Sequence, residues 1–299
     1  LDAIFIEILY ANLVNVIGGL GLGSVYAIIA LGYSMVYGIA KMLNFAHGDV
    51  IMVGAFVAYF ALSSFGLPAI VALILSVVAC TVLGIVVEKL AYKPLRGASS
   101  LSVLITAIGV SYFLQNAAML MWGTDTKIFP TVLEGSLTIG ELSIPYLTLL
   151  TILSCIVIMV VLTMFINKTK TGRAMRACSE DKGAASLMGI NVNQIISITF
   201  AIGSGLAAIA AVLLCATYPS VYPTLGSMPG IKAFTAAVLG GIGSIPGAFL
   251  GGLLLGVIEN LARAYISTQL SDAIVFMVLI VILLIKPTGL LGKKVNVKV

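Results

Sequence analysis

The sequence predicts an all-α, polytopic transmembrane helical bundle of about eight spans that includes broken or re-entrant half-helices. Of its 299 residues, 61% are hydrophobic and only 9% are charged, and the mean hydropathy is +1.18. A soluble domain carries about 25% charged residues, and a membrane-spanning helix needs about 20 mostly apolar residues. The composition therefore excludes a disordered chain, a secreted disulfide scaffold and an ordinary cytosolic enzyme.

Eight apolar stretches divide the chain, and each is a candidate to cross a bilayer. They run over residues 12–31, 46–65, 68–91, 101–122, 142–166, 192–217, 231–260 and 270–285. We expect residues 1–299 to form a single transmembrane domain. The four cysteines include no CxxC pair and the chain has one histidine, so neither a disulfide framework nor a metal site is predicted.

The charged residues predict which side of the membrane each loop occupies. Residues 89–96, 168–182 and 286–298 hold most of the 16 lysines and arginines, and the positive-inside rule places these segments, with the C-terminus, in the cytoplasm. The acidic residues expected on the opposite side are Asp2, Glu7, Asp125, Glu134, Glu141 and Asp272. Topology thus explains the net charge of +5, and no nucleic-acid partner is expected.

This sidedness requires the stretch 231–260 to start and finish outside. We predict a hairpin of two short helices, about 231–241 and 246–260, that turns at Gly240–Gly247. Eleven helical residues rise only about 16 Å, which is half of the hydrocarbon core. A broken or re-entrant element is therefore expected here.

A comparable interruption is predicted from Tyr33 to Asp49, between the first two apolar stretches. Polar groups such as Asn44, the single histidine His47 and Asp49 are costly inside a membrane unless they have a use. Interrupted segments in both halves of a membrane chain point to a transport site. The candidate pathway or gate residues are Asn44, Phe45, His47, Asp49, Gly240, Gly241, Gly243 and Ser244. A hydrogen-bonded helix break is the alternative interpretation.

Two further patterns concern packing and ion pairs near the span ends. Glycines recur four residues apart at Gly19 and Gly23 and along the 243–256 segment, which favours close helix packing over a stripe that lines a pathway. Glu88 is expected to pair with the neighbouring lysines of its loop, and Glu259 with Arg263 at i+4.

The basic loop 167–191 carries more than the positive charge that sets the membrane orientation. Ala184–Leu187 favours a helix and Gly189 a helix stop, and the small residues suit docking into the groove of another protein. The residues expected to transmit force from an attached motor are Arg173, Arg176, Glu180, Gly183, Ala184, Ala185 and Gly189.

At these residues the sequence resembles a family. Gly183-Ala184-Ala185-x-x-x-Gly189 looks like the EAA-x3-G coupling loop of bacterial ABC importer permeases, with Gly183 where Glu is usual. The chain also resembles, from about residue 12 to Gly292, the LivH-type permease of branched-chain amino acid transporters. The motifs that carry this resemblance are Gly23-Ser24-x-Tyr26-Ala27, Asn44–Asp49, Thr171–Cys178 and Lys232–Gly247.

The resemblance implies a multi-pass, non-enzymatic subunit in a bacterial inner membrane. Its expected partners are a second, homologous permease, two cytoplasmic ATPases that use ATP-Mg, and a periplasmic amino-acid-binding protein. The sequence contains no G-x-x-x-x-G-K-[ST] phosphate loop, and no cofactor is expected on this chain. The expected substrates are leucine, isoleucine or valine.

Other functions remain open at this stage. The same kind of importer could carry urea, amides or other amino acids, because those permeases share the pattern. A secondary transporter or channel would need no ATPase. An intramembrane hydrolase would need His47 as its base, and none of the candidate serines (Ser24, Ser34 and Ser244) lies in a protease-like context.

Overall fold

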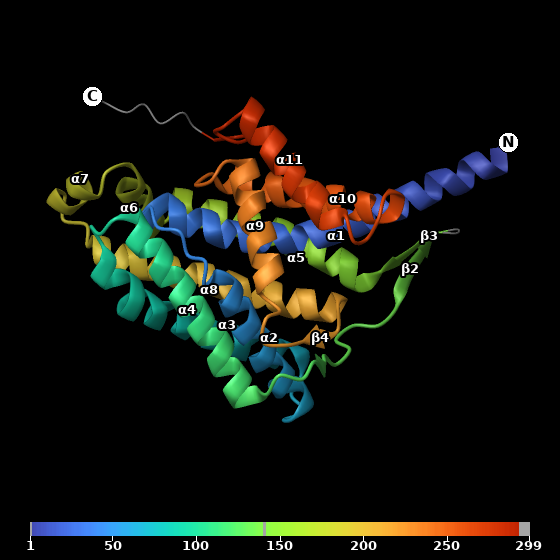
Figure 1. The fold of residues 1–299 in the computed structure, drawn as a ribbon, viewed down its shortest axis with the longest axis horizontal. Coiled ribbons are helices and arrows are strands. Elements are labelled where there is room, and N and C mark those ends of the chain that lie inside the picture. Colours follow the sequence, from blue (N-terminus) through green and yellow to red (C-terminus); the bar gives the residue numbers. More distant parts are fainter. Residues whose placement is uncertain (1, 140–141, 293–299) are drawn as a thin grey trace.

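The computed structural model describes residues 2–139 and 142–292, and over these residues the chain folds into a bundle of helices with two short β-ladders (Figure 1). The helices are α1 (Asp2–Ala40), α2 (His47–Ser63), α3 (Ala69–Val87), α4 (Ser100–Trp122), α5 (Tyr146–Lys168), α6 (Lys170–Glu180), α7 (Lys182–Leu187), α8 (Val192–Thr217), α9 (Ser227–Gly240), α10 (Ile245–Tyr265) and α11 (Ser271–Ile285). A π-helical turn (Glu88–Tyr92) and a 3-10 turn (Lys93–Leu95) extend α3.

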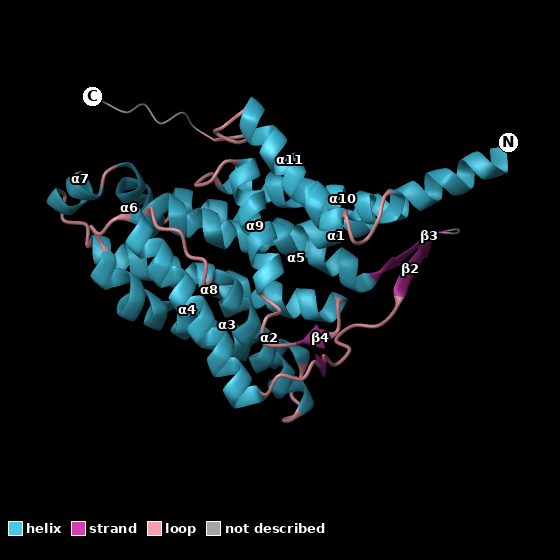
Figure 2. Ribbon diagram, in the orientation of Figure 1, coloured by secondary structure: helices cyan, strands magenta, loops and turns pink. Residues whose placement is uncertain are grey.

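The strands are confined to loops (Figure 2). They form two antiparallel pairs, β1 (Lys127–Ile128) with β4 (Ser220–Val221), and β2 (Ser136–Ile139) with β3 (Leu142–Pro145). The predicted span 142–166 therefore starts late, at Tyr146. Pro145 lacks a backbone N–H and the residues before it are paired as a strand, so the helix begins only after the proline.

The structure confirms a polytopic helical membrane protein. Six segments are long and apolar enough to cross a bilayer: Tyr10–Ala40, Ala69–Leu95, Ser100–Trp122, Tyr146–Lys168, Val192–Thr217 and Ile245–Tyr265. Together with the shorter apolar helices α2 and α11, the structure has eight apolar helices of this kind among the described residues, in agreement with the predicted number of about eight. Of the six long segments, those in α1 and α8 are the most enclosed, whereas α4 and α5 present large apolar side chains outward.

Helices α1 and α10 pack side by side in antiparallel directions. Tyr265 is bonded to Asn12 at one end, and the Gly243 N–H donates to Ser34 Oγ at 2.8 Å at the other. A Cβ built on Gly23 would lie 2.9 Å from the Gly252 carbonyl oxygen. The glycines are thus needed for close helix packing, as the four-residue spacing predicted.

The predicted break between α9 and α10 is confirmed, but its proportions differ. Gly241 (φ +106°) and Gly243 (φ +91°) adopt backbone conformations that favour glycine and end α9. The prediction of a short second helix is wrong, because α10 runs for 21 residues to Tyr265. Glu259 finds cationic partners inside the protein, so its charge does not end the helix.

The first interruption is shorter than predicted. Helix α1 continues without a break to Ala40. The irregular backbone covers residues 41–46 and begins at Lys41, which has φ +57°. Ser34 is compatible with the helix because its hydroxyl is bonded across to the α9–α10 turn. A polar side chain with a partner does not require a helix break.

The predicted partners of Glu88 are also wrong. Glu88 is fully buried, pairs with Arg96 and accepts a hydrogen bond from Ser197 Oγ at 2.6 Å. Lys89 and Lys93 lie on exposed surface. The Glu88 side of the π-helical turn faces Ser197 of α8, and Arg96 is the basic residue that reaches the carboxylate there within the described part of the chain.

The basic segments meet at one end of the bundle. Lys182 Nζ donates to the Ala40 carbonyl at 2.6 Å, Arg96 is bonded to Asn193, and the Leu290 N–H donates to the Leu239 carbonyl at 2.8 Å. Helices α6 and α7 lie at this end, and the β2–β3 hairpin lies at the other (Figure 1). Glu141, Lys293, Lys294 and Lys298, which also entered the charge argument, lie outside the described residues.

Candidate functional site

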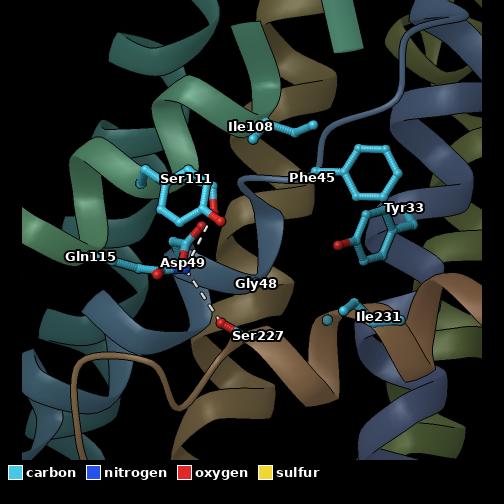
Figure 3. Close-up of a pocket in the computed structure, with 11 residues that line it drawn as sticks. Tyr33, Phe45, Gly48, Asp49, Ile108, Ser111, Gln115, Ser227 and Ile231 are labelled. Atoms are coloured by element: carbon cyan, nitrogen blue, oxygen red, sulfur yellow. Dashed lines mark hydrogen bonds between the residues drawn. The ribbon is translucent and has the colours of Figure 1, made fainter. Parts of the chain in front are cut away.

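A pocket of about 250 Å³ lies where α1, the 41–46 connection, α2, α4 and α9 meet (Figure 3). A single water needs only about 10–15 Å³, so the space can hold a small molecule. Its lining residues are Tyr33, Phe45, Gly48, Asp49, Ile108, Ser111, Tyr112, Gln115, Ser227, Gly230 and Ile231.

Two helices begin at this pocket, and glycines let them meet. A Cβ on Gly48 would lie 2.5 Å from the Gly226 carbonyl oxygen, and a Cβ on Gly226 would overlap the Gly48 carbonyl. The first turns of α2 and α9 are therefore in backbone contact. Neither N-cap residue, Ala46 or Gly226, has a side chain that accepts a hydrogen bond from the first-turn N–H groups. Since both first turns line the pocket, the positive ends of both helix dipoles lie beside it.

Asp49 is the acidic residue of the site. It is 2% exposed, and its carboxylate accepts a hydrogen bond from Gln115 Nε2 at 2.9 Å. The same amide lies 3.3 Å from the hydroxyl oxygens of Ser111 and Ser227. Among the ion pairs of the described residues, none involves Asp49. Only neutral donors and a helix N-terminus therefore stabilise this buried acid.

The opposite half of the pocket is apolar. Figure 3 shows Phe45, Tyr33, Ile108 and Ile231 around one side, and Asp49, Ser111, Gln115 and Ser227 on the other. The Phe45 and Tyr33 rings both pack on Phe234 of α9, with centroid separations of 5.5 and 5.9 Å. The pocket is thus amphipathic, with a polar and an apolar end.

Asn44 and His47 lie next to the pocket but do not line it. Asn44 Oδ1 accepts a hydrogen bond from Tyr92 at 2.8 Å and so ties the 41–46 connection to the end of α3. The His47 ring packs edge-on against Tyr33, 4.6 Å between centroids, and its buried Nε2 has no hydrogen-bond partner within the described part of the chain. Both residues hold the backbone that presents Phe45 and Asp49.

The other predicted pathway residues lie at the far end of α9. Gly240, Gly241, Gly243 and Ser244 form the α9–α10 turn, which packs against the Ser34–Gly38 part of α1 and against the segment around Gly292. The pocket reaches along α9 as far as Ile231, and Gly240 lies nine residues further on, a rise of about 14 Å along the helix. The two interruptions therefore do not build one pocket.

Sequence reasoning missed the contributions of α4 and of the start of α9. A signal was present in α4, since Ser111, Tyr112 and Gln115 carry polar groups in the middle of an apolar stretch. Polar side chains inside a membrane span usually have a function. Ser227 and Gly230 carried no comparable signal, because they lie before the predicted helix start at residue 231.

A second buried charged cluster connects α9, α10 and α11. Lys232 Nζ lies 2.8 Å from Glu259 and 2.6 Å from Asp272, and Arg263 also pairs with Glu259. The predicted Glu259–Arg263 pair is thus confirmed, and Lys232 and Asp272 extend it. Lys232 also lies over the Tyr26 ring of α1, at 5.9 Å. Two cations and two anions balance within this cluster.

The predicted loop 167–191 contains two short helices. Gly172, Met175 and Cys178 of α6 are buried, whereas Arg173, Arg176 and Glu180 are exposed. The predicted helix over Ala184–Leu187 is confirmed as α7, and Gly189 (φ +82°) follows its end as predicted.

The tip of α7 is an exposed apolar surface on a charged loop. Asp181 caps the helix by accepting from the N–H groups of Gly183 and Ala184 at 2.7 and 3.0 Å. Ala185 is buried, whereas Leu187 and Met188 are 91% and 83% exposed. Lys182 connects this element to the end of α1; its burial, together with the charges of Arg96 and Lys41, lowers its pKa.

Comparison with known proteins decides the family. Residues 15–283 match the model of the branched-chain amino acid transport system/permease component family. The chain belongs to this family. Over 298 residues, which are 95% of the chain and 97% of the relative, it is 47% identical to the high-affinity branched-chain amino acid transport system permease protein BraD of Pseudomonas aeruginosa. Over 288 residues, 92% and 94% of the two chains, it is 43% identical to LivH of Escherichia coli. As a member of this family the chain is a membrane permease component and not an enzyme.

Proposed function

We propose that this chain is one permease subunit of an ATP-driven importer that carries leucine, isoleucine and valine across a bacterial inner membrane. The relatives named for high-affinity branched-chain amino acid transport support this substrate class. The observation that carries the proposal is the amphipathic pocket, because one end matches the polar groups of an amino acid and the other its branched side chain.

The rim of the pocket supports a second permease as the partner. Ile108, Tyr112 and Ile231 line the pocket and are 44%, 63% and 44% exposed. A pocket that contains a carboxylate is unfavourable against lipid. We infer that a second, homologous permease covers the opening, so that the substrate crosses between the two subunits.

The α6–α7 segment supports ATPases as the source of energy. The exposed Leu187 and Met188 at the tip of a basic loop suit insertion into a groove of a cytoplasmic partner. In this proposal the ATPases bind ATP-Mg, the basic end of the bundle and the C-terminus are cytoplasmic, and a periplasmic binding protein delivers the substrate. Lys182 at the start of α7 donates to the carbonyl of Ala40, the residue just before the 41–46 connection that lines the pocket.

Within this proposal the two interruptions have separate roles. Residues 41–46 and the start of α2 shape the pathway, and Asn44 and His47 hold them in position. The turn at Gly240–Ser244 would act as a hinge or gate at the basic end, where α1 and the segment after α11 converge on it. If substituting Asn44 or His47 leaves uptake and coupling unchanged, their assignment is wrong.

The test is uptake of radiolabelled leucine into proteoliposomes that contain this chain with its copurified partners, with binding protein outside and ATP inside. The proposal predicts uptake that requires ATP and is competed by isoleucine and valine. Leucine flux without ATP would indicate a secondary transporter, and uptake of urea or polar amino acids in place of leucine would replace the substrate.

A further inference from the structure

We propose that the Asp49 carboxylate binds the α-ammonium group of the translocated amino acid, while Phe45, Ile108 and Ile231 contact its side chain. This inference rests on the proposed function and names the subsite that the pocket provides for the substrate's positive charge.

The first argument is the missing counter-charge. Asp49 is 2% exposed in a membrane protein, and a charge in that position is costly unless it is paired. The other two buried acids of the described residues, Glu88 and Glu259, each have at least one basic partner. Asp49 has no basic partner among the described residues, and its hydrogen bonds come from neutral side chains, the Gln115 amide at 2.9 Å and the Ser111 hydroxyl. A cationic ligand would complete this site in the way that Lys232 completes the other cluster.

The second argument is shape. The carboxylate faces a cavity of about 250 Å³ whose other end is apolar (Figure 3). A small metal ion would leave most of this space unused, and no group of three His, Cys, Asp or Glu among the described residues could hold one. An organic ammonium ion with a short branched hydrocarbon chain fits both ends of the pocket.

The third argument concerns the substrate's carboxylate. The α9 N-terminus, where Gly226 provides no capping side chain, is in backbone contact with the first turn of α2. Helix N-termini favour anions. The α2 terminus already holds Asp49, which leaves the α9 terminus for the substrate's negative group. A zwitterion would thus meet opposite charges on two adjacent helices.

Two analogues of leucine test the ammonium subsite without any substitution. 3-Methylbutan-1-amine keeps the ammonium group and lacks the carboxylate, whereas 4-methylpentanoate keeps the carboxylate and lacks the ammonium group. The measurement is the unfolding temperature of the detergent-purified transporter against millimolar concentrations of each. We expect leucine and the amine to raise it and the acid not to. Equal protection by the acid, or none by the amine, would overturn the assignment.

The matching variant is Asp49→Asn, with Asp125→Asn as its control, because Asp125 is an exposed acid in a loop. We expect Asp49→Asn to abolish the protection by the amine and to lower ATP-driven leucine uptake at least about tenfold, the effect of losing one charge-assisted hydrogen bond. The control should keep both. If the wild type takes up leucine and the Asp49→Asn variant does so equally well, the subsite alone is refuted. If the wild type shows no ATP-driven leucine uptake, the proposed function is refuted.

Discussion

Two buried acids on adjacent parts of the bundle have opposite electrostatic surroundings. Glu259 on α10 is fully buried and contacts Lys232 and Arg263. Asp49 on α2 is almost as buried, and the groups around it within the described residues are neutral. The first acid is part of a balanced cluster that joins three helices, and the second faces a cavity.

The difference separates a structural charge from one available to a ligand. A buried ion pair whose partners belong to the same chain fixes the packing of the helices that carry them. A buried acid without such a partner keeps an unfavourable energy that a cationic ligand can remove. Lys232 follows the pocket residue Ile231 in sequence, so the balanced cluster also holds α9 in place at the pocket.

The largest expected effect comes from breaking the balanced cluster. Glu259→Gln removes the charged partner of Arg263 and one of the two charged partners of Lys232. Removing one member of a buried pair costs about 3–5 kcal/mol. We expect a large fall in the unfolding temperature and in the yield of purified protein. Glu134→Gln, which changes an exposed acid, is the control and should unfold like the wild type. A thermally unchanged Glu259→Gln variant would show that the cluster does not stabilise the fold.

A smaller effect is expected from separating the two helices that begin at the pocket. In Gly226→Ala the added Cβ would overlap the Gly48 carbonyl, so α2 and α9 must move apart; overpacking of this kind costs about 1–3 kcal/mol. We expect lower stability and reduced leucine uptake. Gly109→Ala is the matched control, because a Cβ there meets nothing within 4 Å, and it should be neutral or slightly stabilising. Normal uptake by Gly226→Ala would show that the contact is not needed for the pathway.

The smallest effect on stability is expected at the connection to α7. Lys182→Met removes the hydrogen bond from Lys182 Nζ to the Ala40 carbonyl, and a single hydrogen bond contributes about 1 kcal/mol. We expect a nearly unchanged unfolding temperature but fewer leucine molecules transported per ATP hydrolysed. Lys170→Met, an exposed lysine on α6, should leave this ratio unchanged. A wild-type ratio in Lys182→Met would exclude this contact from coupling.

Much of the fold could be predicted from sequence because the membrane imposes long apolar helices, and residues as distinctive as the Gly240–Gly247 run mark where they break. Helix α7 was also predictable, since Ala184–Leu187 and Gly189 are local signals of a short helix and its end. The site was only partly predictable. The motif Asn44–Asp49 pointed to the right region. Which of its side chains face the pocket depends on where α1 ends, and the sequence did not show that α1 extends to Ala40.

The remaining errors have the same physical origin. Local sequence could not show that Arg96 would reach Glu88 in place of the lysines, or that Lys232 would join Glu259 and Asp272. Nor could it place Gln115 of α4 against Asp49. These contacts are set by tertiary packing, because the partners lie on different elements or turns.

The most direct test of the contrast between the two acids is the unfolding temperature of Asp49→Asn, measured without substrate. The variant keeps the size of the side chain and one acceptor oxygen for the Gln115 amide, replaces the other oxygen by an NH2 donor, and removes the charge. If Asp49 is an unpaired charge available to a ligand, removing the charge relieves an unfavourable burial, and the variant will unfold at or above the wild-type temperature. A marked decrease, like that expected for Glu259→Gln, would show that the charge stabilises the fold and would contradict this account.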